Sequence, residues 1–199
     1  MIHDGYTQKS EPYQRTAPRY ALHPRAERRG GLGASAREGA RSGGVSMEML
    51  MSALLVAIDP GPHTGIACRL TDDSFVTIAK EHPGDVWSML KHDPPKMVAC
   101  ETFYTGGRID IHMLRTIEMV GGVKAVCHML QIPLFVQQPQ ERTAFLDEAR
   151  ALLGEYYSRA TKTQRRAAAE HELDALAHLL LLEWRLIHGK LDASKLVDY

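Results

Sequence analysis

The chain of 199 residues lacks the features that mark several whole classes of protein. Its three cysteines are widely spaced and form no Cys-x-x-Cys pair, which argues against a structural zinc site and indicates buried thiols in a reducing cytoplasm. The longest apolar stretch, residues 175–182, contains His178 and is too short to span a bilayer. The N-terminus has no apolar segment typical of a secretory signal peptide. We therefore expect a cytoplasmic protein.

The chain also lacks a net charge, so its composition neither supports nor excludes a nucleic-acid partner. The balance hides a difference between two parts of the chain. Residues 1–52 carry eight Lys or Arg and five Asp or Glu, whereas residues 53–199 carry 16 Lys or Arg and 19 Asp or Glu. The length suits one domain with a sizeable core plus an appendage. Function must therefore be inferred from local patterns.

Residues 1–52 are predicted to form a disordered tail rich in Arg, Gly and Ala, because residues 1–46 show no apolar period. A solvated tail is one interpretation, and a basic arm that helps to hold DNA is another. Met47, Met49 and Met51 precede the first apolar run, so a natural start at one of them is a third hypothesis.

From residue 53 onward, short apolar runs alternate with amphipathic segments. Strands are expected over about residues 53–59, 65–70, 74–79, 97–100 and 134–136. Helices are expected over about residues 85–92, 110–130, 140–157 and 164–188. Three strands followed by alternating helices and strands predict one α/β domain over residues 53–199, with a mixed five-stranded sheet flanked by helices. This is the order of elements in a ribonuclease-H-like fold.

The first predicted strand ends in Asp59, before a tight Pro/Gly turn and a second apolar run that begins at Gly65. A carboxylate at the rim of a buried sheet needs a compensating charge, which is usually a metal ion. The fourth predicted strand ends in the same way, at Glu101. Because these two strands are neighbours in such a sheet, we expect Asp59 and Glu101 to lie within reach of one ion.

The last predicted helix carries a third carboxylate, Asp174, at the edge of an apolar stripe, with His171 one turn earlier on the same face. Three carboxylates suit Mg²⁺ or Mn²⁺, and two such ions about 4 Å apart would activate a water and stabilise a leaving 3′ oxygen. His171 could be a ligand, manage a proton on that water, or lie on an exposed helix face. Glu170 is a weaker ligand candidate, and His178 is expected to pack inside.

The three acids also have separate structural explanations. Asp59 could start a turn, and Glu101 could form an ion pair at the strand end. Asp174 could pair with Arg165 or Arg166. The joint pattern favours a metal site over these explanations taken one at a time.

Three blocks occur in a specific order: Ile58-Asp59-Pro60-Gly61 with Thr64-Gly65, then Glu101, then His171-x-x-Asp174-Ala175-Leu176-Ala177. Residues 53–188 thereby resemble the RuvC-type Holliday junction resolvases, and are closest in kind to the divergent members from bacteriophages. The resemblance implies a ribonuclease-H-like fold, a location in a bacterial or phage-infected cell, and a homodimer that nicks branched DNA symmetrically to leave 5′-phosphate and 3′-OH ends. It implies that four residues are catalytic and hold two Mg²⁺ or Mn²⁺ ions: Asp59, Glu101, His171 and Asp174.

Two segments are candidates for DNA contacts. In the resolvases an aromatic residue after the second acid stacks on a base, which implies this role for Tyr104, with Phe103 beside it. Arg108 follows two glycines on the same loop and could enter a junction. The loop before the last helix could hold phosphates, with a solvated charged loop as the alternative. Its basic residues are Arg159, Lys162, Arg165 and Arg166.

Gly121 and Gly122 interrupt the helix predicted over residues 110–130, at about 1 kcal/mol each. Close packing of another helix or of DNA would explain the two glycines. By analogy with the resolvases, this helix builds the dimer interface. The alternative is that it packs on the sheet of its own chain. Its predicted apolar positions are Leu114, Ile117, Val120, Val123, Val126 and Leu130. Two features depart from the family: the tail is foreign to it, and residues 137–142 are less basic than expected.

Other functions remain open. The same site would serve a broader nuclease acting on flaps, forks or single strands. An RNA-acting nuclease of the YqgF branch matches the block around Asp174 less well. A sugar- or acetate-kinase-like ATPase needs two such domains, which 199 residues do not supply. A catalytically inactive scaffold that binds branched DNA is disfavoured because all the acids are retained.

Overall fold

The computed structural model describes residues 13–15, 53–80, 82–102, 111–163 and 165–197. Within these ranges, no helix combines the length and the apolar character needed to cross a membrane. The loop that carries Phe103, Tyr104 and Arg108 lies outside the described residues, so its predicted DNA contacts stay predictions.

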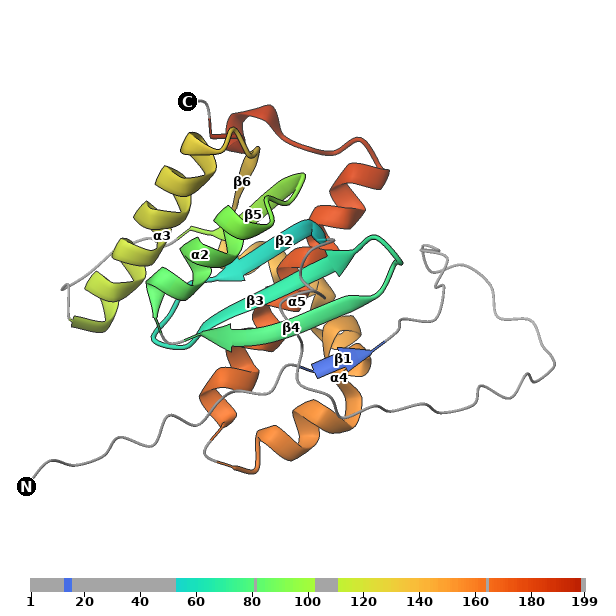
Figure 1. The fold of residues 1–199 in the computed structure, drawn as a ribbon. Helices are drawn as coiled ribbons and strands as arrows, with labels where there is room; N and C mark the ends of the chain where they lie inside the picture. Colours follow the sequence, from blue (N-terminus) through green and yellow to red (C-terminus); the bar gives the residue numbers. More distant parts are fainter. Residues whose placement is uncertain (1–12, 16–52, 81, 103–110, 164, 198–199) are drawn as a thin grey trace, which may run out of the picture.

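One mixed sheet forms the centre of the protein, in the strand order β1-β4-β3-β2-β5-β6 (Figure 1). Strands β2, β3 and β4 pair antiparallel, whereas β5 and β6 continue from β2 as parallel neighbours. The five predicted strands are all present within one residue of their expected bounds: β2 (Ala53–Asp59), β3 (Thr64–Leu70), β4 (Phe75–Lys80), β5 (Met97–Glu101) and β6 (Leu134–Gln137). The predicted mixed α/β architecture is therefore confirmed.

The sixth strand, β1 (Tyr13–Arg15), lies in the segment that the sequence analysis assigned to a disordered tail. It pairs antiparallel with residues 75–77 of β4 at the edge of the sheet. The prediction of disorder is therefore wrong for these three residues. The other residues of the 1–52 segment lie outside the described ranges, where the prediction is untested.

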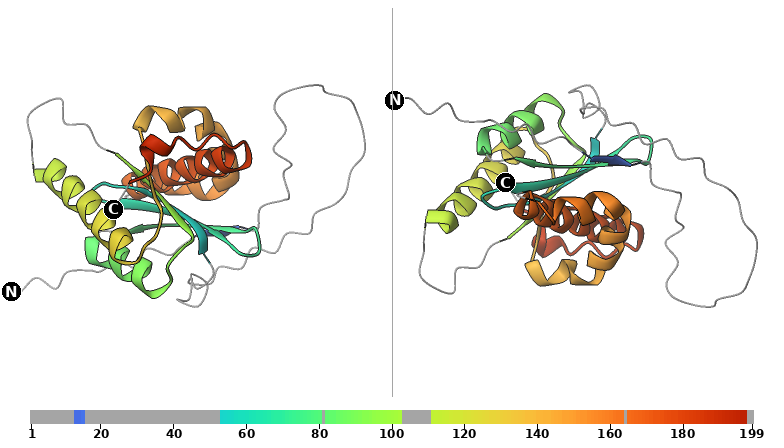
Figure 2. Two further views of the ribbon diagram at one scale, coloured as in Figure 1. Left: turned by 90° about the horizontal axis from the view of Figure 1, so that it is seen from above. Right: turned by 90° about the horizontal axis from the view of Figure 1, so that it is seen from below.

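Helices cover both faces of the sheet, with α2 and α3 on one side and α4 and α5 on the other (Figure 2). Alternate residues of each central strand serve opposite faces: Val56 and Ile58 pack with α2 and α3, whereas Ala57 packs with α5. Burial on both faces explains why the strands are continuous apolar runs. The helical elements are α2 (Pro83–His92), α3 (Ile111–Met129), η1 (Pro139–Phe145), α4 (Leu146–Ala160), α5 (Arg166–Ile187) and η2 (Ala193–Lys195).

The segment predicted as one helix over residues 140–157 is two elements. It begins as the 3₁₀ helix η1, where Gln138 and Glu141 cap each other's backbone N–H groups and Pro139 starts the first turn. The α-helix α4 follows and is interrupted at Gly154, whose φ of 52° lies in the left-handed region. The apolar period thus predicted the helical segment, but not its division.

Four of the six predicted apolar positions in and just after α3 contact the core, namely Val120, Val123, Val126 and Leu130, and two do not. The buried residues of α3 are Thr116, Met119, Val123, Val126 and Cys127, whereas Leu114 and Ile117 are exposed. Gly122 lies against Trp87 of α2, where a Cβ would come within 2.3 Å of the indole ring. Gly121 faces open space. Packing between two helices of the same chain therefore explains one glycine of the pair.

The three cysteines, Cys68, Cys100 and Cys127, are free and buried, as the sequence predicts. Burial raises the pKa of Cys68 to about 12. A buried thiol that stays protonated is a poor nucleophile and a poor metal ligand. These cysteines therefore act as small apolar side chains of the core.

Candidate active site

Two carboxylates lie side by side at one end of the sheet, as the strand order predicts. Asp59 ends β2 and Glu101 ends β5, and these strands are parallel neighbours. Each acid lies on the same face of the sheet as the alanine two positions before it, and these alanines, Ala57 and Ala99, pack against α5. Asp59 is 3% exposed and Glu101 is 9% exposed, so two acids are buried under one helix.

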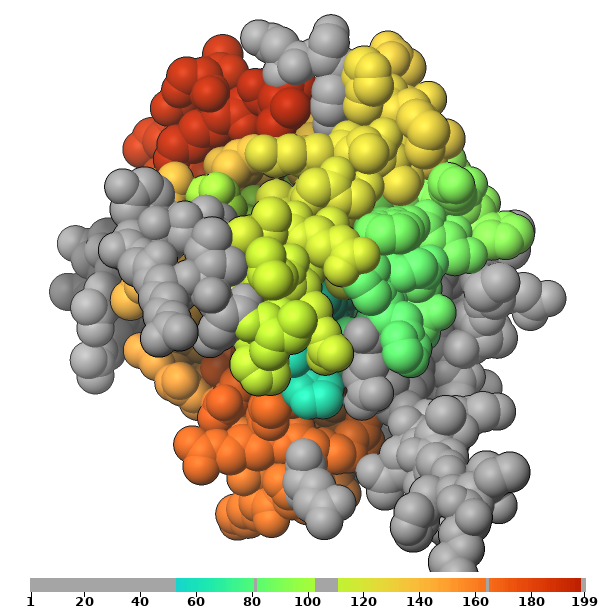
Figure 3. Space-filling model, turned by 90° about the vertical axis from the view of Figure 1, so that its left-hand side faces the viewer, coloured from blue at the N-terminus to red at the C-terminus, as the bar shows by residue number. Residues whose placement is uncertain are grey.

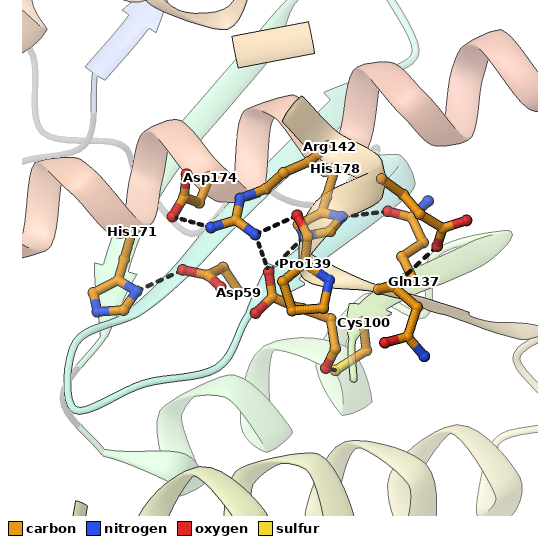
Figure 4. Close-up of polar contacts among 11 residues, drawn as sticks. Asp59, Cys100, Gln137, Pro139, Arg142, His171, Asp174 and His178 are labelled. Atoms are coloured by element: carbon orange, nitrogen blue, oxygen red, sulfur yellow. Dashed lines mark hydrogen bonds and ion pairs between the residues drawn. The ribbon is translucent and has the colours of Figure 1, made fainter. Parts of the chain in front are cut away.

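Helix α5 supplies the other two predicted residues, His171 and Asp174, on the face that it turns toward the sheet (Figure 4). The turn after Asp59 allows this helix to approach closely. A Cβ on Gly61 would come within 2.5 Å of the His171 ring, so a side chain here would displace the imidazole. The Thr64 hydroxyl donates a hydrogen bond to the Gly61 carbonyl at 3.0 Å and fixes the turn. The Pro/Gly turn therefore makes room for α5.

His171 contacts Asp59 directly, with Nδ1 lying 2.5 Å from Oδ2. Burial raises the pKa of Asp59, and the nearby carboxylates of Glu101 and Asp174 raise it further. Burial opposes the charged form of His171, but its hydrogen bond to Asp59 and the surrounding carboxylates raise its pKa overall. The pKa of each group is therefore raised above its ordinary value.

Arg142 of η1 lies between the other two acids. Its Nη1 donates to Oε2 of Glu101 and its Nη2 donates to Oδ2 of Asp174, each at 2.7 Å. Figure 4 shows the guanidinium group pointing into the space beside Asp174. Arg142 is not among the predicted site residues, because residues 137–142 are less basic than the resemblance to the resolvases implies. Asp174 thus has a partner from η1, whereas Arg166, one of its predicted partners, pairs with Glu170.

His178 is fully buried, as expected, but it also belongs to the site. Its Nε2 lies 2.8 Å from Oε2 of Glu101, and its Nδ1 lies 2.5 Å from Oε1 of Gln137. The residue follows Asp174 by four positions, and that spacing places it on the same helix face. This spacing was the available signal that His178 would reach the acids.

Among solved structures, RuvC from Thermus thermophilus in complex with a Holliday junction substrate matches with a TM-score of 0.51 and 17% identity, over 72% of this chain and 98% of that chain. The chain has the RuvC fold. A second structure of Thermus thermophilus RuvC gives a TM-score of 0.48 at 18% identity, over 72% of this chain and 99% of that one. The yeast mitochondrial Holliday junction resolvase Ydc2 gives a TM-score of 0.42 at 10% identity, over 72% of this chain and 87% of that one. No protein-family model and no curated protein matches the sequence.

The predicted ribonuclease-H-like fold is therefore confirmed as that of RuvC, and the four predicted residues lie together in it. The donor set of three carboxylates and one imidazole fits Mg²⁺ or Mn²⁺, which prefer oxygen ligands. In the described part of the chain, however, no three His, Cys, Asp or Glu side chains are already oriented around one ion position. The ion pairs of Arg142 with Glu101 and Asp174 provide a reason for this.

The predicted basic residues lie from the end of α4 to the start of α5, the helix that carries His171. Arg159 and Lys162 are exposed, and Arg166 is exposed while it pairs with Glu170. Arg165 is half-buried. Glu170, the weaker ligand candidate, lies on the exposed side of α5 with Arg166. The loop is therefore largely open to a polyanionic partner.

Proposed function

We propose that this protein is a metal-dependent endonuclease that hydrolyses phosphodiester bonds in branched DNA, with a four-way junction as its preferred substrate. The observation that carries the proposal is the convergence of two buried carboxylates at parallel strand ends with a half-buried carboxylate on the facing helix. A cluster of buried acids is unfavourable unless cations stabilise it. Such a cluster in a RuvC fold is suited to hold divalent ions beside a phosphate.

In this proposal Asp59, Glu101 and Asp174 hold two Mg²⁺ or Mn²⁺ ions, with His171 as a fourth ligand or as a proton carrier. When bound, such ions lower the pKa of a water and stabilise the leaving 3′ oxygen, which leaves a 5′-phosphate and a 3′-OH. The contact between Nδ1 of His171 and Asp59 orients the imidazole ring. Its Nε2 is then the atom that can take up or release a proton at the attacking water.

DNA would approach the site along the exposed basic loop before α5. Arg159 and Lys162 would neutralise phosphates, and such contacts position a duplex without reading its sequence. Tyr104 and Phe103 would stack on unpaired bases near the centre of a junction. An enzyme that recognises a branch by its shape needs contacts of this kind.

We further propose that the enzyme is a homodimer that assembles through α3. Figure 3 shows α3 across the centre of one face, with α2 beside it. The exposed fractions of three apolar residues on this helix are 61% for Ile111, 51% for Leu114 and 42% for Ile117. They recur at intervals of three positions, and Gly121 on the same helix faces open space. An apolar stripe of this kind suits a two-fold contact that would match a two-fold substrate.

A cleavage assay with a panel of substrates tests the proposal. The wild type, an Asp59→Asn variant and an Asp85→Asn control are incubated with a four-way junction, a flap and a linear duplex, in Mg²⁺, Mn²⁺ or EDTA. Asp85 is an exposed acid on α2 and therefore controls for the loss of a carboxylate elsewhere. We expect paired symmetric nicks in the junction, lost in Asp59→Asn and in EDTA but kept in Asp85→Asn.

The other outcomes identify other functions. Efficient cleavage of flaps without a preference for junctions would keep the metal site and contradict the resolvase assignment. Binding of the junction without cleavage, under every metal condition, would contradict the nuclease and favour a scaffold.

A further inference from the structure

Arg142 holds two acids that come from different elements. Glu101 ends β5 and Asp174 lies on α5, and the guanidinium group donates to both at 2.7 Å. Nη1 also donates to the carbonyl of Pro139 at 2.7 Å, whereas Nε is buried and has no hydrogen-bond partner among the residues that the structure describes. One cationic side chain from η1 therefore connects a strand end to a helix across the predicted metal site.

The charges explain why a cation is needed there. Asp59 and Glu101 end adjacent parallel strands, and one guanidinium group reaches both Glu101 and Asp174, so the three carboxylates lie close together and repel one another when ionised. His171 compensates Asp59 through their direct contact. Arg142 compensates the remaining two acids, since its fork makes one charge-assisted hydrogen bond to each. The metal-free site therefore carries its own counter-ions.

Several contacts of Glu141 hold the backbone of η1, which carries Arg142. Oε2 of Glu141 accepts the Gln138 N–H at 2.7 Å and caps η1. Oε1 of Glu141 accepts a hydrogen bond from Arg185 Nη2 at 2.5 Å and another from Lys195. These ion pairs lower the pKa of Glu141 to about 2, although burial opposes this shift, so the carboxylate remains ionised at neutral pH. These contacts of Glu141 fix η1, so a withdrawal of the guanidinium group would require rotation about the side-chain bonds of Arg142.

We propose that Arg142 is an internal counter-ion that occupies the place a divalent cation would take between Glu101 and Asp174, and so sets the affinity of the site for metal. This inference rests on the proposed metal-dependent function. Oε2 of Glu101 and Oδ2 of Asp174 bind the guanidinium, and a divalent cation between the same two atoms would lie against a like charge. Metal entry therefore requires Arg142 to withdraw, and the free energy of its two ion pairs opposes metal binding.

Manganese binding without DNA tests this competition. Isothermal titration calorimetry would compare the metal-free wild type with Arg142→Gln, and with Arg150→Gln as a matched control. Arg150 is half-exposed on α4, where it pairs with Asp147 of the same helix and not with an acid of the site. We expect Arg142→Gln to bind Mn²⁺ about tenfold more tightly than the wild type or more, and Arg150→Gln to match the wild type. Unchanged or weaker binding by a folded Arg142→Gln protein would overturn the proposal.

Thermal unfolding gives an independent readout and a check on folding. We expect Arg142→Gln to melt below the wild type in EDTA, because two acids lose their counter-ion, and to gain more in melting temperature from Mn²⁺. An equal Mn²⁺-induced gain in both proteins would contradict the inference. If the Gln variant does not fold, Arg142→Lys serves instead. It keeps the charge but loses the fork, so its Mn²⁺ affinity should exceed that of the wild type.

The proposed function and this inference fail in different ways. Tight Mn²⁺ binding by Arg142→Gln, with no cleavage of any DNA by the wild type, would refute the nuclease and support the counter-ion. Cleavage by the wild type, with equal Mn²⁺ affinity in both proteins, would refute the counter-ion alone. No Mn²⁺ binding by any of the folded proteins would overturn both.

Discussion

Gly65 lies so close to the backbone of His171 that a Cβ on the glycine would come within 2.0 Å of the His171 carbonyl oxygen. Gly65 pairs with Asp59 across the β2–β3 hairpin. The same contact therefore fixes the distance between α5 and the strand that delivers the first acid. This explains why a Thr-Gly pair accompanies the Asp-Pro-Gly turn in the sequence: two backbones meet there, and only a glycine fits.

Substitution of Gly65 by alanine should destabilise the fold. The obstruction is the backbone of α5, which cannot rotate aside, so we expect a loss of about 1–3 kcal/mol in the free energy of unfolding. Urea denaturation measures this loss. Gly84→Ala is the matched control, since a Cβ at Gly84 would meet nothing within 4 Å. Equal stability of the Gly65→Ala variant and the control would contradict the account of close approach.

Glu172 should make stability depend on pH. It is buried between α4, α5 and β4, and it accepts hydrogen bonds from Tyr156 and Thr77, each at 3.0 Å. Burial raises its pKa above the ordinary value of 4.5, despite these hydrogen bonds. The native state therefore binds the proton more tightly than the unfolded chain. The stability this confers is complete below pH 4.5 and is lost as pH rises through the native pKa.

A Glu172→Gln variant should remove this dependence. We expect its free energy of unfolding, relative to the wild type, to increase as pH rises above 4.5. Urea denaturation at a series of pH values measures the difference. Parallel pH profiles for the two proteins would show that Glu172 has the same pKa in the native and unfolded states, contrary to this prediction.

A charge on the exposed stripe of α3 should dissociate the proposed dimer. We expect Leu114→Glu to sediment as a monomer where the wild type sediments as a dimer, because the carboxylate would be buried against an apolar partner surface. Analytical ultracentrifugation measures the mass. Ile187→Glu places the same charge on an apolar residue of α5 that is 65% exposed, and it should remain dimeric. A dimeric Leu114→Glu protein would exclude α3 as the interface.

The sequence was sufficient for much of the fold because its strands are buried on both faces and are bounded by turn residues. Asp59 and Glu101 could be placed together because each ends an apolar run, and the strand order makes those runs neighbours. The faces of α3 were predicted less well. Leu114 and Ile117 match an apolar period, yet the helix turns Thr116 and Met119 inward instead. Periodicity cannot distinguish a core face from an apolar face left for a partner.

Arg142 could not be placed from the sequence, and only its spacing from Asp174 indicated that His178 would reach the acids, because both roles depend on tertiary contacts. Arg142 lies 41 residues from Glu101 and 32 from Asp174, and nothing local marks an arginine in η1 as their partner. His178 lies 77 residues from Glu101. Local patterns identify charged residues at the ends of strands and helices, but the residues that compensate these charges lie far away in the sequence.

The central claim is that Asp59, Glu101 and Asp174 hold the metal ions that cleave DNA, and single-turnover cleavage of a four-way junction tests it most directly. Rates would be measured in saturating Mn²⁺ for the wild type, Asp174→Asn and the Asp85→Asn control, with circular dichroism to show that each is folded. The account predicts a fall of roughly 10³-fold or more for Asp174→Asn and no change for the control. A rate for folded Asp174→Asn within about threefold of the wild type would contradict it, because an amide cannot replace an anionic metal ligand.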